Sequence, residues 1–140
     1  MSQSQLFLLD ITSDMSNLAR VADFVAEAAQ KVKLTQRQSD DVQMAVDEAV
    51  TNVMEHAYAG ESDGRISIKM RVDDQELFVE IRDQGKEFNA KKVKKPNIKG
   101  PLSERSIGGL GIFFMKKLMD KVEFTRDQTG NVTRMSKKLK

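Results

Sequence analysis

Cysteine and tryptophan are absent from this sequence of 140 residues, and histidine and tyrosine occur once each. The absence of cysteine excludes disulfide bonds and thiolate metal sites, and a single histidine does not predict a zinc site. No segment approaches the roughly 20 apolar residues of a membrane-spanning helix, and the polar first five residues do not resemble a signal peptide. We therefore expect a cytoplasmic protein that does not contact a membrane.

A strong charge of one sign is also missing. The formal net charge is +2, with 31% charged and 39% hydrophobic residues, as is usual for a globular protein. Basic residues gather in residues 86–99 and again at the end of the chain, but this imbalance is too small to predict direct binding of nucleic acid. A chain of this length can bury a core of its own, so we expect residues 1–140 to form a single domain.

Hydrophobic periodicity and turn residues predict a sheet with helices packed against it. Ser13 is placed to cap the first helix, and Thr35 with Gln38 forms a capping-box pattern at the start of the second. In chain order, the expected elements are a strand over residues 6–11, helices over 15–31 and from 35, strands over 66–72 and 77–81, a helix over 110–119, and strands over 122–126 and 132–138. Since hairpins dominate this order, we expect an α/β two-layer sandwich, with a mixed and mostly antiparallel sheet and the helices on one face.

Residues 47–58 predict a helix with one apolar side. Glu48, Asn52 and His56 follow one another at four-residue spacing, which puts a carboxylate, an amide and an imidazole on one helix face. An asparagine oxygen suits Mg²⁺, which binds through few protein groups and through phosphate oxygens. Glu48 could then take the proton of a hydroxyl or water that attacks a γ-phosphate. A solvated helix edge is the alternative, and for His56 we expect a hydrogen bond near the helix end.

Two further motifs fit a nucleotide. Asp83 ends an apolar strand, where its carboxylate could accept from the exocyclic amine of adenine, and Gly85 would let the backbone approach a flat ring. Gly108, Gly109 and Gly111 open the third helix, whose first N–H groups and positive dipole favour phosphates. Each motif is common by itself, since Asp-x-Gly often follows a strand and glycines before a helix also form hinges. Together with the helix above, they predict a nucleotide site.

In this order, Glu-x-x-x-Asn on a helix, Asp-x-Gly after a strand and Gly-Gly-Leu-Gly before a helix resemble the Bergerat ATP-binding fold of gyrase, histidine kinases and heat-shock chaperone ATPases. Four segments most resemble the bacterial anti-sigma factor serine kinases: 48–52 (Glu-Ala-Val-Thr-Asn), 56–58 (His-Ala-Tyr), 104–106 (Glu-Arg-Ser) and 118–122 (Leu-Met-Asp-Lys-Val). Glu48 also separates this family from histidine kinases, which generally lack the acid. The resemblance covers essentially the whole chain.

The resemblance implies binding of ATP and Mg²⁺, phosphorylation of a serine on a small anti-sigma factor antagonist, and sequestration of a sigma factor by a kinase homodimer. It implies that Glu48 is the catalytic base and that Asn52 binds both nucleotide and metal. Arg20 resembles an exposed arginine that the family uses for partner contact, with an ordinary surface arginine as the alternative. The other residues expected to contact the nucleotide are Asp83, Gly85, Arg105, Gly108, Gly109, Leu110, Gly111 and Thr133.

Two departures and a long loop bear on this interpretation. Glu87 stands where the family often has a second glycine, and Thr133 does not directly follow a glycine as in a clean Gly-Thr pair. Residues 84–107 lack periodicity and contain both prolines and six lysines, and we expect this loop to be a lid over the nucleotide. The alternative to a kinase is a non-catalytic nucleotide-binding partner-switch module, which Glu87 favours and Glu48 disfavours. An ATPase subunit of a larger machine is a third possibility, disfavoured because no second domain is present.

Overall fold

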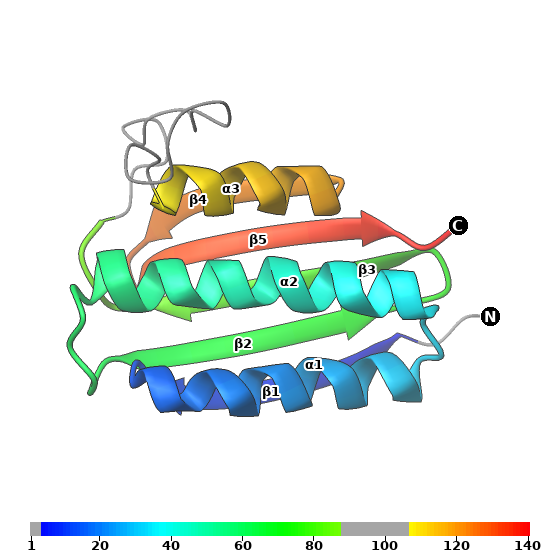
Figure 1. The fold of residues 1–140 in the computed structure, drawn as a ribbon, viewed down its shortest axis with the longest axis horizontal. Coiled ribbons are helices and arrows are strands. Elements are labelled where there is room, and N and C mark those ends of the chain that lie inside the picture. The colour runs from blue at the N-terminus through cyan, green and yellow to red at the C-terminus, as the bar shows by residue number, and fades with distance from the viewer. Residues whose placement is uncertain (1–3, 88–106) are drawn as a thin grey trace.

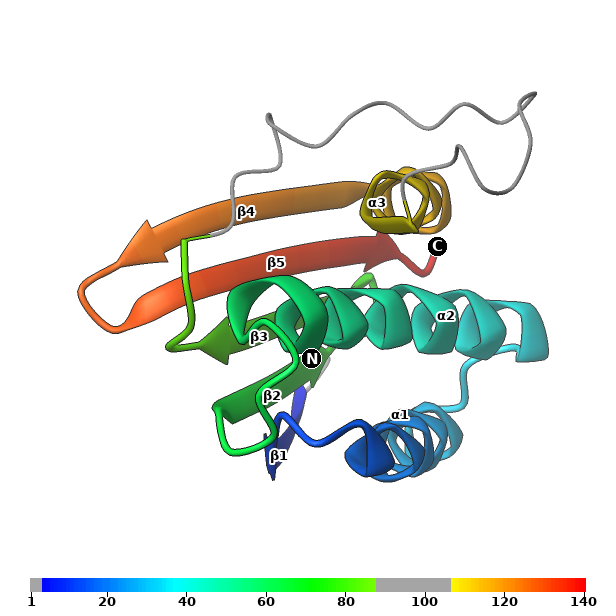
Figure 2. The same cartoon turned by 60° about the vertical axis from the view of Figure 1, so that its left-hand side comes forward.

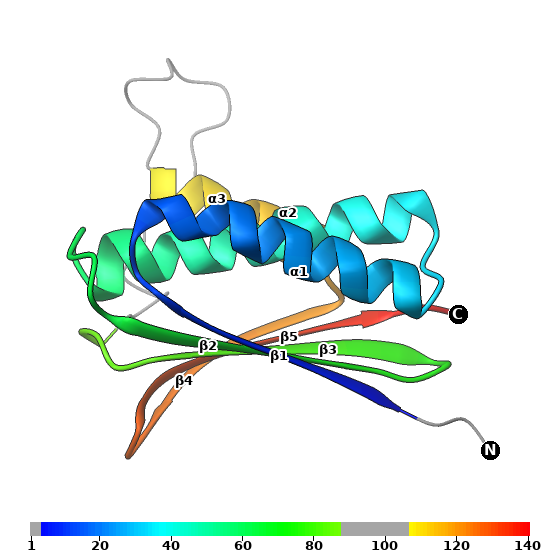
Figure 3. The same ribbon diagram turned by 90° about the horizontal axis from the view of Figure 1, so that it is seen from below.

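The computed structural model describes residues 4–87 and 107–140, which form an open sheet covered on one side by helices (Figures 1 and 3). The strands are β1 (Gln5–Thr12), β2 (Arg65–Val72), β3 (Glu76–Asp83), β4 (Lys121–Asp127) and β5 (Gly130–Lys138). Their order in the sheet is β1-β2-β3-β5-β4, and each neighbouring pair is antiparallel. The predicted two-layer sandwich is therefore confirmed, and the described sheet has no parallel pair.

Three α-helices cover one face of the sheet. They are α1 (Leu18–Lys31), α2 (Gln36–Asn52) and α3 (Ile107–Leu118). Helix α2 lies between the other two, with α1 toward β1 and α3 toward β4 (Figures 1 and 2). Within the described ranges, no helix is both long enough and apolar enough to cross a bilayer.

The alternation of apolar and polar residues decides which face of each strand is buried. Along β2 and β3 every second residue faces the helices, as period-2 alternation requires. These buried residues are Ile66, Ile68, Met70, Val72, Leu77, Val79, Ile81 and Asp83. Asp83, the last residue of β3, follows the same alternation, so its carboxylate lies on the side of the sheet that faces the core.

Helix α2 begins as the sequence predicts and ends in an unexpected way. The Thr35 side chain accepts from Gln38 N at 3.1 Å and the Gln38 side chain accepts from Thr35 N at 2.9 Å, which completes the capping box. After Asn52 the chain continues as a π-helical turn, η2 (Val53–Ala57). A π turn holds more residues than an α turn, so the step from Asn52 to His56 is not the α-helical one that the sequence predicts, and the alignment of His56 with Glu48 and Asn52 stays a prediction. His56 is exposed.

The first helix is not capped by Ser13. A 3-10 turn, η1 (Met15–Asn17), precedes α1, and Asp14 caps it by accepting from Ser16 N at 2.9 Å. Ser13 is buried, donates its hydroxyl to the Glu61 carbonyl and accepts from Gly64 N at 2.9 Å. It therefore joins the end of β1 to the start of β2, a long-range contact that local sequence does not reveal.

Candidate nucleotide site

The glycine motif of α3 packs directly on the acid and amide of α2. A Cβ atom built on Gly111 would lie 2.6 Å from Glu48 Oε2 and 3.9 Å from Asn52 Nδ2. Next along α3, Asn52 Nδ2 lies 3.8 Å from Met115 Sδ. A side chain at position 111 would thus meet the Glu48 carboxylate, and glycine permits this close approach. Two of the three predicted motifs meet here.

The glycines do not form a loop before the helix. Helix α3 begins at Ile107, so Gly108, Gly109 and Leu110 lie within its first turn. Glycine lowers helix stability by only about 1 kcal/mol, and packing of α3 against α2 offsets this cost. The backbone N–H groups of this first turn still have no acceptor within the helix. Arg105 and most of the predicted lid lie outside the described residues.

A narrow pocket between α2 and the sheet brings together three of the predicted nucleotide residues. Its lining comprises Ala49, Asn52, Val53, Ala57, Asp83, Phe124, Thr125, Asn131, Val132 and Thr133. Thr133 therefore faces the pocket, which the sequence left open. The pocket volume is about 10 Å³, the space of one water molecule, so an adenine ring enters only when lining groups move apart.

Asp83 is the acid that lines this pocket, and 3% of its surface is exposed. Its Oδ1 accepts from Gly85 N at 2.9 Å and from Asn131 Nδ2 at 2.8 Å. Burial raises the pKa of Asp83, while the two hydrogen bonds and the charge of Arg126 act in the opposite direction. Both hydrogen bonds end on Oδ1, so Oδ2 can accept from a further donor such as an exocyclic amine.

Glu48 lies half-buried at the edge of α2. Burial raises its pKa first, and the negative charges of Asp47 and Glu55 raise it further. Burial also raises the pKa of Asp47. Ionisation of Glu48 is therefore less favourable than that of an exposed glutamate.

Gly85 has a packing role that the sequence did not predict. A Cβ atom on Gly85 would lie 2.6 Å from the carbonyl carbon of Ala57 and 2.8 Å from its Cβ. The next residue, Lys86, donates its N–H to the Ala57 carbonyl at 2.7 Å. Gly85 therefore lets the turn after β3 lie against the π turn η2. Its contact with a nucleotide stays a prediction.

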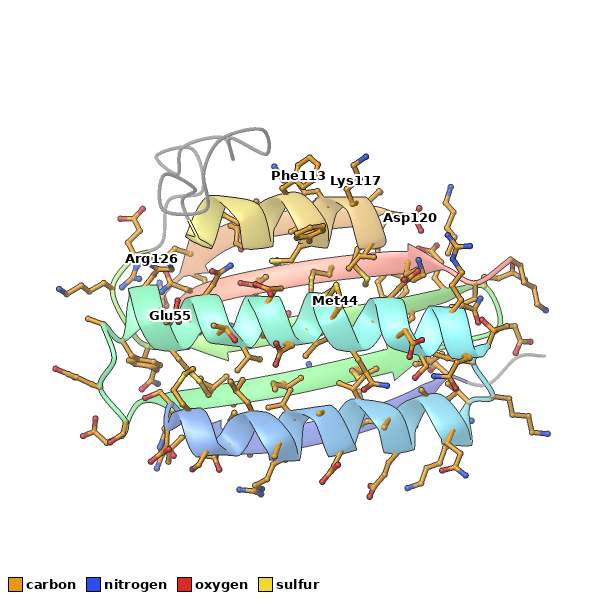
Figure 4. All side chains as sticks on the ribbon, in the orientation of Figure 1. Met44, Glu55, Phe113, Lys117, Asp120 and Arg126 are labelled. Carbon is orange, nitrogen blue, oxygen red and sulfur yellow. The ribbon has the colours of Figure 1, made fainter. Side chains whose placement is uncertain are left out.

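Asn131 and Arg126 are site residues that sequence reasoning missed. Asn131 is paired with Asp83 across β5 and β3, and Arg126 is paired with Asn131 across β4 and β5. Arg126 Nη1 donates to Asn131 Oδ1 at 2.9 Å. Arg126 lies at the end of the molecule where α2 ends near Glu55 (Figure 4). The sequence signal for Asn131 was its position directly after Gly130, where the Gly-Thr pair of the family would have threonine.

Two further predictions concern partner contact by Arg20 and metal binding by Asn52. Arg20 is exposed on α1 and lines a different groove, together with Asn17 and Arg65. Among residues 4–87 and 107–140, no three His, Cys, Asp or Glu side chains gather closely enough to hold a metal between them. Binding of Mg²⁺ by Asn52 together with phosphate oxygens stays a prediction.

Comparison with known proteins supports the same grouping of motifs. The sequence pattern of the histidine kinase-like ATPase domain matches residues 11–137. The chain is 36% identical over 97 residues to the serine-protein kinase RsbW of Listeria innocua, covering 66% of this chain and 62% of that protein. It is 33% identical over 117 residues to RsbW of Bacillus velezensis, covering 79% of this chain and 71% of that protein. RsbW of Bacillus subtilis is 32% identical with the same coverage.

The fold also has a counterpart among solved structures. The crystal structure of the RsbU and RsbW domains of a Mycobacterium tuberculosis protein matches 96% of this chain and 32% of that chain, with a TM-score of 0.70 and 15% identity. At this identity the match shows the fold alone. The family pattern and the Bacillus relatives show more: the chain belongs to the histidine kinase-like ATPase domain family, on the branch of the RsbW proteins.

Proposed function

We propose that this protein is an ATP-dependent protein-serine kinase and anti-sigma factor, which phosphorylates a serine of a small antagonist protein and sequesters a sigma factor. The observation that carries the proposal is the approach of Gly111 in α3 to Glu48 and Asn52 in α2. It puts a carboxylate beside the helix turn expected to hold phosphates. The RsbW relatives, which are named serine-protein kinases, support this activity.

The pocket residues fit ATP with Mg²⁺. Asp83 has a buried carboxylate whose Oδ2 would accept from the adenine amine, and Thr133 lines the same pocket. The backbone N–H groups of Gly108 and Gly109, in the first turn of α3, would bind phosphate oxygens. Asn52 would bind Mg²⁺, whose charge offsets that of the triphosphate when the ion is bound.

Glu48 is the residue we assign to proton transfer. Because burial and neighbouring carboxylates raise its pKa, Glu48 holds a proton more readily than an exposed glutamate. Such a base takes the proton of a serine hydroxyl while the oxygen bonds to the γ-phosphorus and ADP leaves. Only the ionised form accepts the proton, so we expect transfer to decline on acidification, at a higher pH than for an ordinary glutamate.

The structure weakens the main support for a non-catalytic switch. Glu87, which replaces the second glycine of the family, is exposed and does not line the pocket. In the turn before it, Gln84 N donates to the Tyr58 hydroxyl and Asn131 donates to the Lys86 carbonyl, so the turn does not depend on a glycine at position 87. A non-catalytic partner switch remains the second candidate function, to be separated by the experiment below.

The surfaces that we propose for partner binding and for dimerisation lie away from the pocket. Arg20 and Arg65 line one groove, where we expect an acidic segment of a partner protein. We expect the homodimer to use the face of the sheet opposite the helices (Figure 3). Leu6 and Leu8 are 57% and 65% exposed on β1, and burying such side chains in a dimer is favourable. The cytoplasmic location stays a prediction.

Phosphoryl transfer by a Glu48→Gln variant tests the proposal. The antagonist is isolated by pull-down with ATP and with ADP, and transfer of radiolabelled γ-phosphate to it is then measured. Glutamine is nearly isosteric but accepts no proton, so we expect transfer to fall by roughly 10²–10⁴-fold. ATP affinity should change little, because Asn52 and Asp83 are intact.

The matched control is Asp47→Asn, which removes the neighbouring carboxylate without touching the contact of Glu48 with Gly111. We expect this control to change transfer far less than Glu48→Gln. Equal rates for wild type and Glu48→Gln would exclude Glu48 as the base. No transfer by wild type to an antagonist that it binds would favour the non-catalytic switch.

A further inference from the structure

The turn that follows Asp83 is held by side chains from outside the predicted motifs. Tyr58 Oη accepts from Gln84 N at 2.7 Å, and Asp83 Oδ1 accepts from Gly85 N at 2.9 Å. The Gly85 carbonyl accepts from Arg126 at 3.3 Å, and the Lys86 carbonyl accepts from Asn131 Nδ2 at 2.7 Å. Most backbone polar groups of residues 84–86 therefore have a partner before any nucleotide binds.

Arg126, together with the Lys86 carbonyl, fixes which way the Asn131 amide points. A guanidinium group only donates hydrogen bonds, so the atom of Asn131 that meets Arg126 must be Oδ1. The amide nitrogen then points the other way, and it donates to Asp83 Oδ1 at 2.8 Å and to the Lys86 carbonyl at 2.7 Å. Asn131 is 5% exposed, so water would not readily replace the hydrogen bonds that a reversed amide would lose.

This orientation controls what Asp83 can offer a ligand. A donor against Oδ1 favours the ionised carboxylate, which can only accept. An acceptor against Oδ1 would instead favour a proton shared between the two groups, and a protonated Asp83 could donate. An ionised Asp83 suits the amine at position 6 of adenine and repels the carbonyl oxygen at position 6 of hypoxanthine or guanine.

We propose that Asn131, held by Arg126, makes this pocket select a 6-amino purine nucleotide over a 6-oxo one, because it keeps Asp83 a hydrogen-bond acceptor. The inference rests on the proposed nucleotide site and adds two positioning residues to it. The three side chains form one row across β4, β5 and β3, since Arg126 is paired with Asn131 and Asn131 with Asp83.

Calorimetric titration of the full chain with ADP and with IDP, each in the presence of Mg²⁺, tests the inference. IDP carries a carbonyl oxygen where ADP carries the amine. We expect wild type to prefer ADP by about tenfold or more. Asn131→Asp puts an acceptor against Asp83, and the ratio of the two affinities should fall by about tenfold. Arg126→Met, at an exposed position, should lower the ratio by about threefold.

Tyr58→Phe is the matched control, because it also removes a hydrogen bond to the turn, and the lost hydroxyl is bonded to Gln84 N and the Arg65 carbonyl rather than to Asn131. It should weaken ADP and IDP by the same factor and leave the ratio unchanged. Circular dichroism checks folding, and Arg126→Met supplies the test if Asn131→Asp does not fold. An unchanged ratio in a folded Arg126→Met variant, or an equal change in Tyr58→Phe, would overturn the inference alone. Failure of wild type to bind ADP would overturn the nucleotide site as well.

Discussion

The two ends of the proposed nucleotide site, around Asp83 and around Glu48, are built in different ways. At the adenine end, the Asp83 carboxylate accepts two hydrogen bonds and the following turn is fixed to the π turn η2. At the other end, Glu48 is half-buried beside Asp47 and Glu55, whose charges oppose its ionisation. In the proposed function, recognition would use groups whose hydrogen bonds are already made, whereas proton transfer would use a carboxylate whose ionisation its surroundings oppose.

The glycines of the two ends show the same contrast. Added atoms at Gly85 would meet the backbone of Ala57, while added atoms at Gly111 would first meet the end of the Glu48 side chain. A backbone cannot move aside as readily as a side-chain terminus. The adenine end is therefore expected to be rigid, and the catalytic end adaptable.

Among the variants that test this comparison, Asp83→Asn should have the largest effect, a loss of ATP affinity. The amide nitrogen of asparagine would face the adenine amine, so a charge-assisted hydrogen bond is replaced by two opposed donors. We expect ATP affinity to fall by roughly 10- to 100-fold, measured by titration of a fluorescent ATP analogue. Asp74→Asn, in the turn between β2 and β3, is the control. Wild-type affinity in Asp83→Asn would remove Asp83 from the site.

A pair of glycine variants tests rigidity directly. Gly85→Ala should lower the free energy of unfolding by about 2 kcal/mol, because the methyl group overlaps the Ala57 backbone. Gly111→Ala should change it by less than about 1 kcal/mol, since Glu48 can rotate away and alanine favours the helix. Urea unfolding measures both. Equal losses of stability would contradict the difference between the two ends.

The smallest expected effect concerns pH. A carboxyl group with a raised pKa in the folded state stabilises the fold below its unfolded pKa, and this contribution is lost as pH rises through the folded pKa. Replacing Glu48 by glutamine should therefore stabilise the protein at neutral pH by on the order of 0.5 kcal/mol. The gain should disappear on acidification to below the ordinary glutamate pKa. Thermal unfolding across this range measures it, with Glu27→Gln on α1 as control.

Local sequence predicted the features that depend on near neighbours in the chain. The period-2 alternation located β2 and β3, and the Thr35 capping box located the start of α2. The nucleotide motifs were found because each is a short pattern. The glycines of α3 were predicted as a loop, since the effect of packing on a helix start cannot be read from composition.

The missed features depend on residues far apart in the sequence. Asn131 meets Asp83 only because β5 pairs with β3, and Arg126 joins them only through the register of β4 on β5. The π turn after Asn52 ends at Ala57, which contacts Gly85 and accepts a hydrogen bond from Lys86 N. None of these contacts follows from hydrophobic periodicity, because a shift of two residues in strand register would leave the same side chains facing the core.

Tyr58 also gives this protein a spectroscopic reporter. It is the only tyrosine in a sequence without tryptophan, and its hydroxyl donates to the Arg65 carbonyl at 2.6 Å and accepts from Gln84 N at 2.7 Å. Burial raises the pKa of this phenol. Alkaline titration followed by phenolate absorbance would therefore report, without any label, how firmly the start of β2 and the turn after Asp83 are held together.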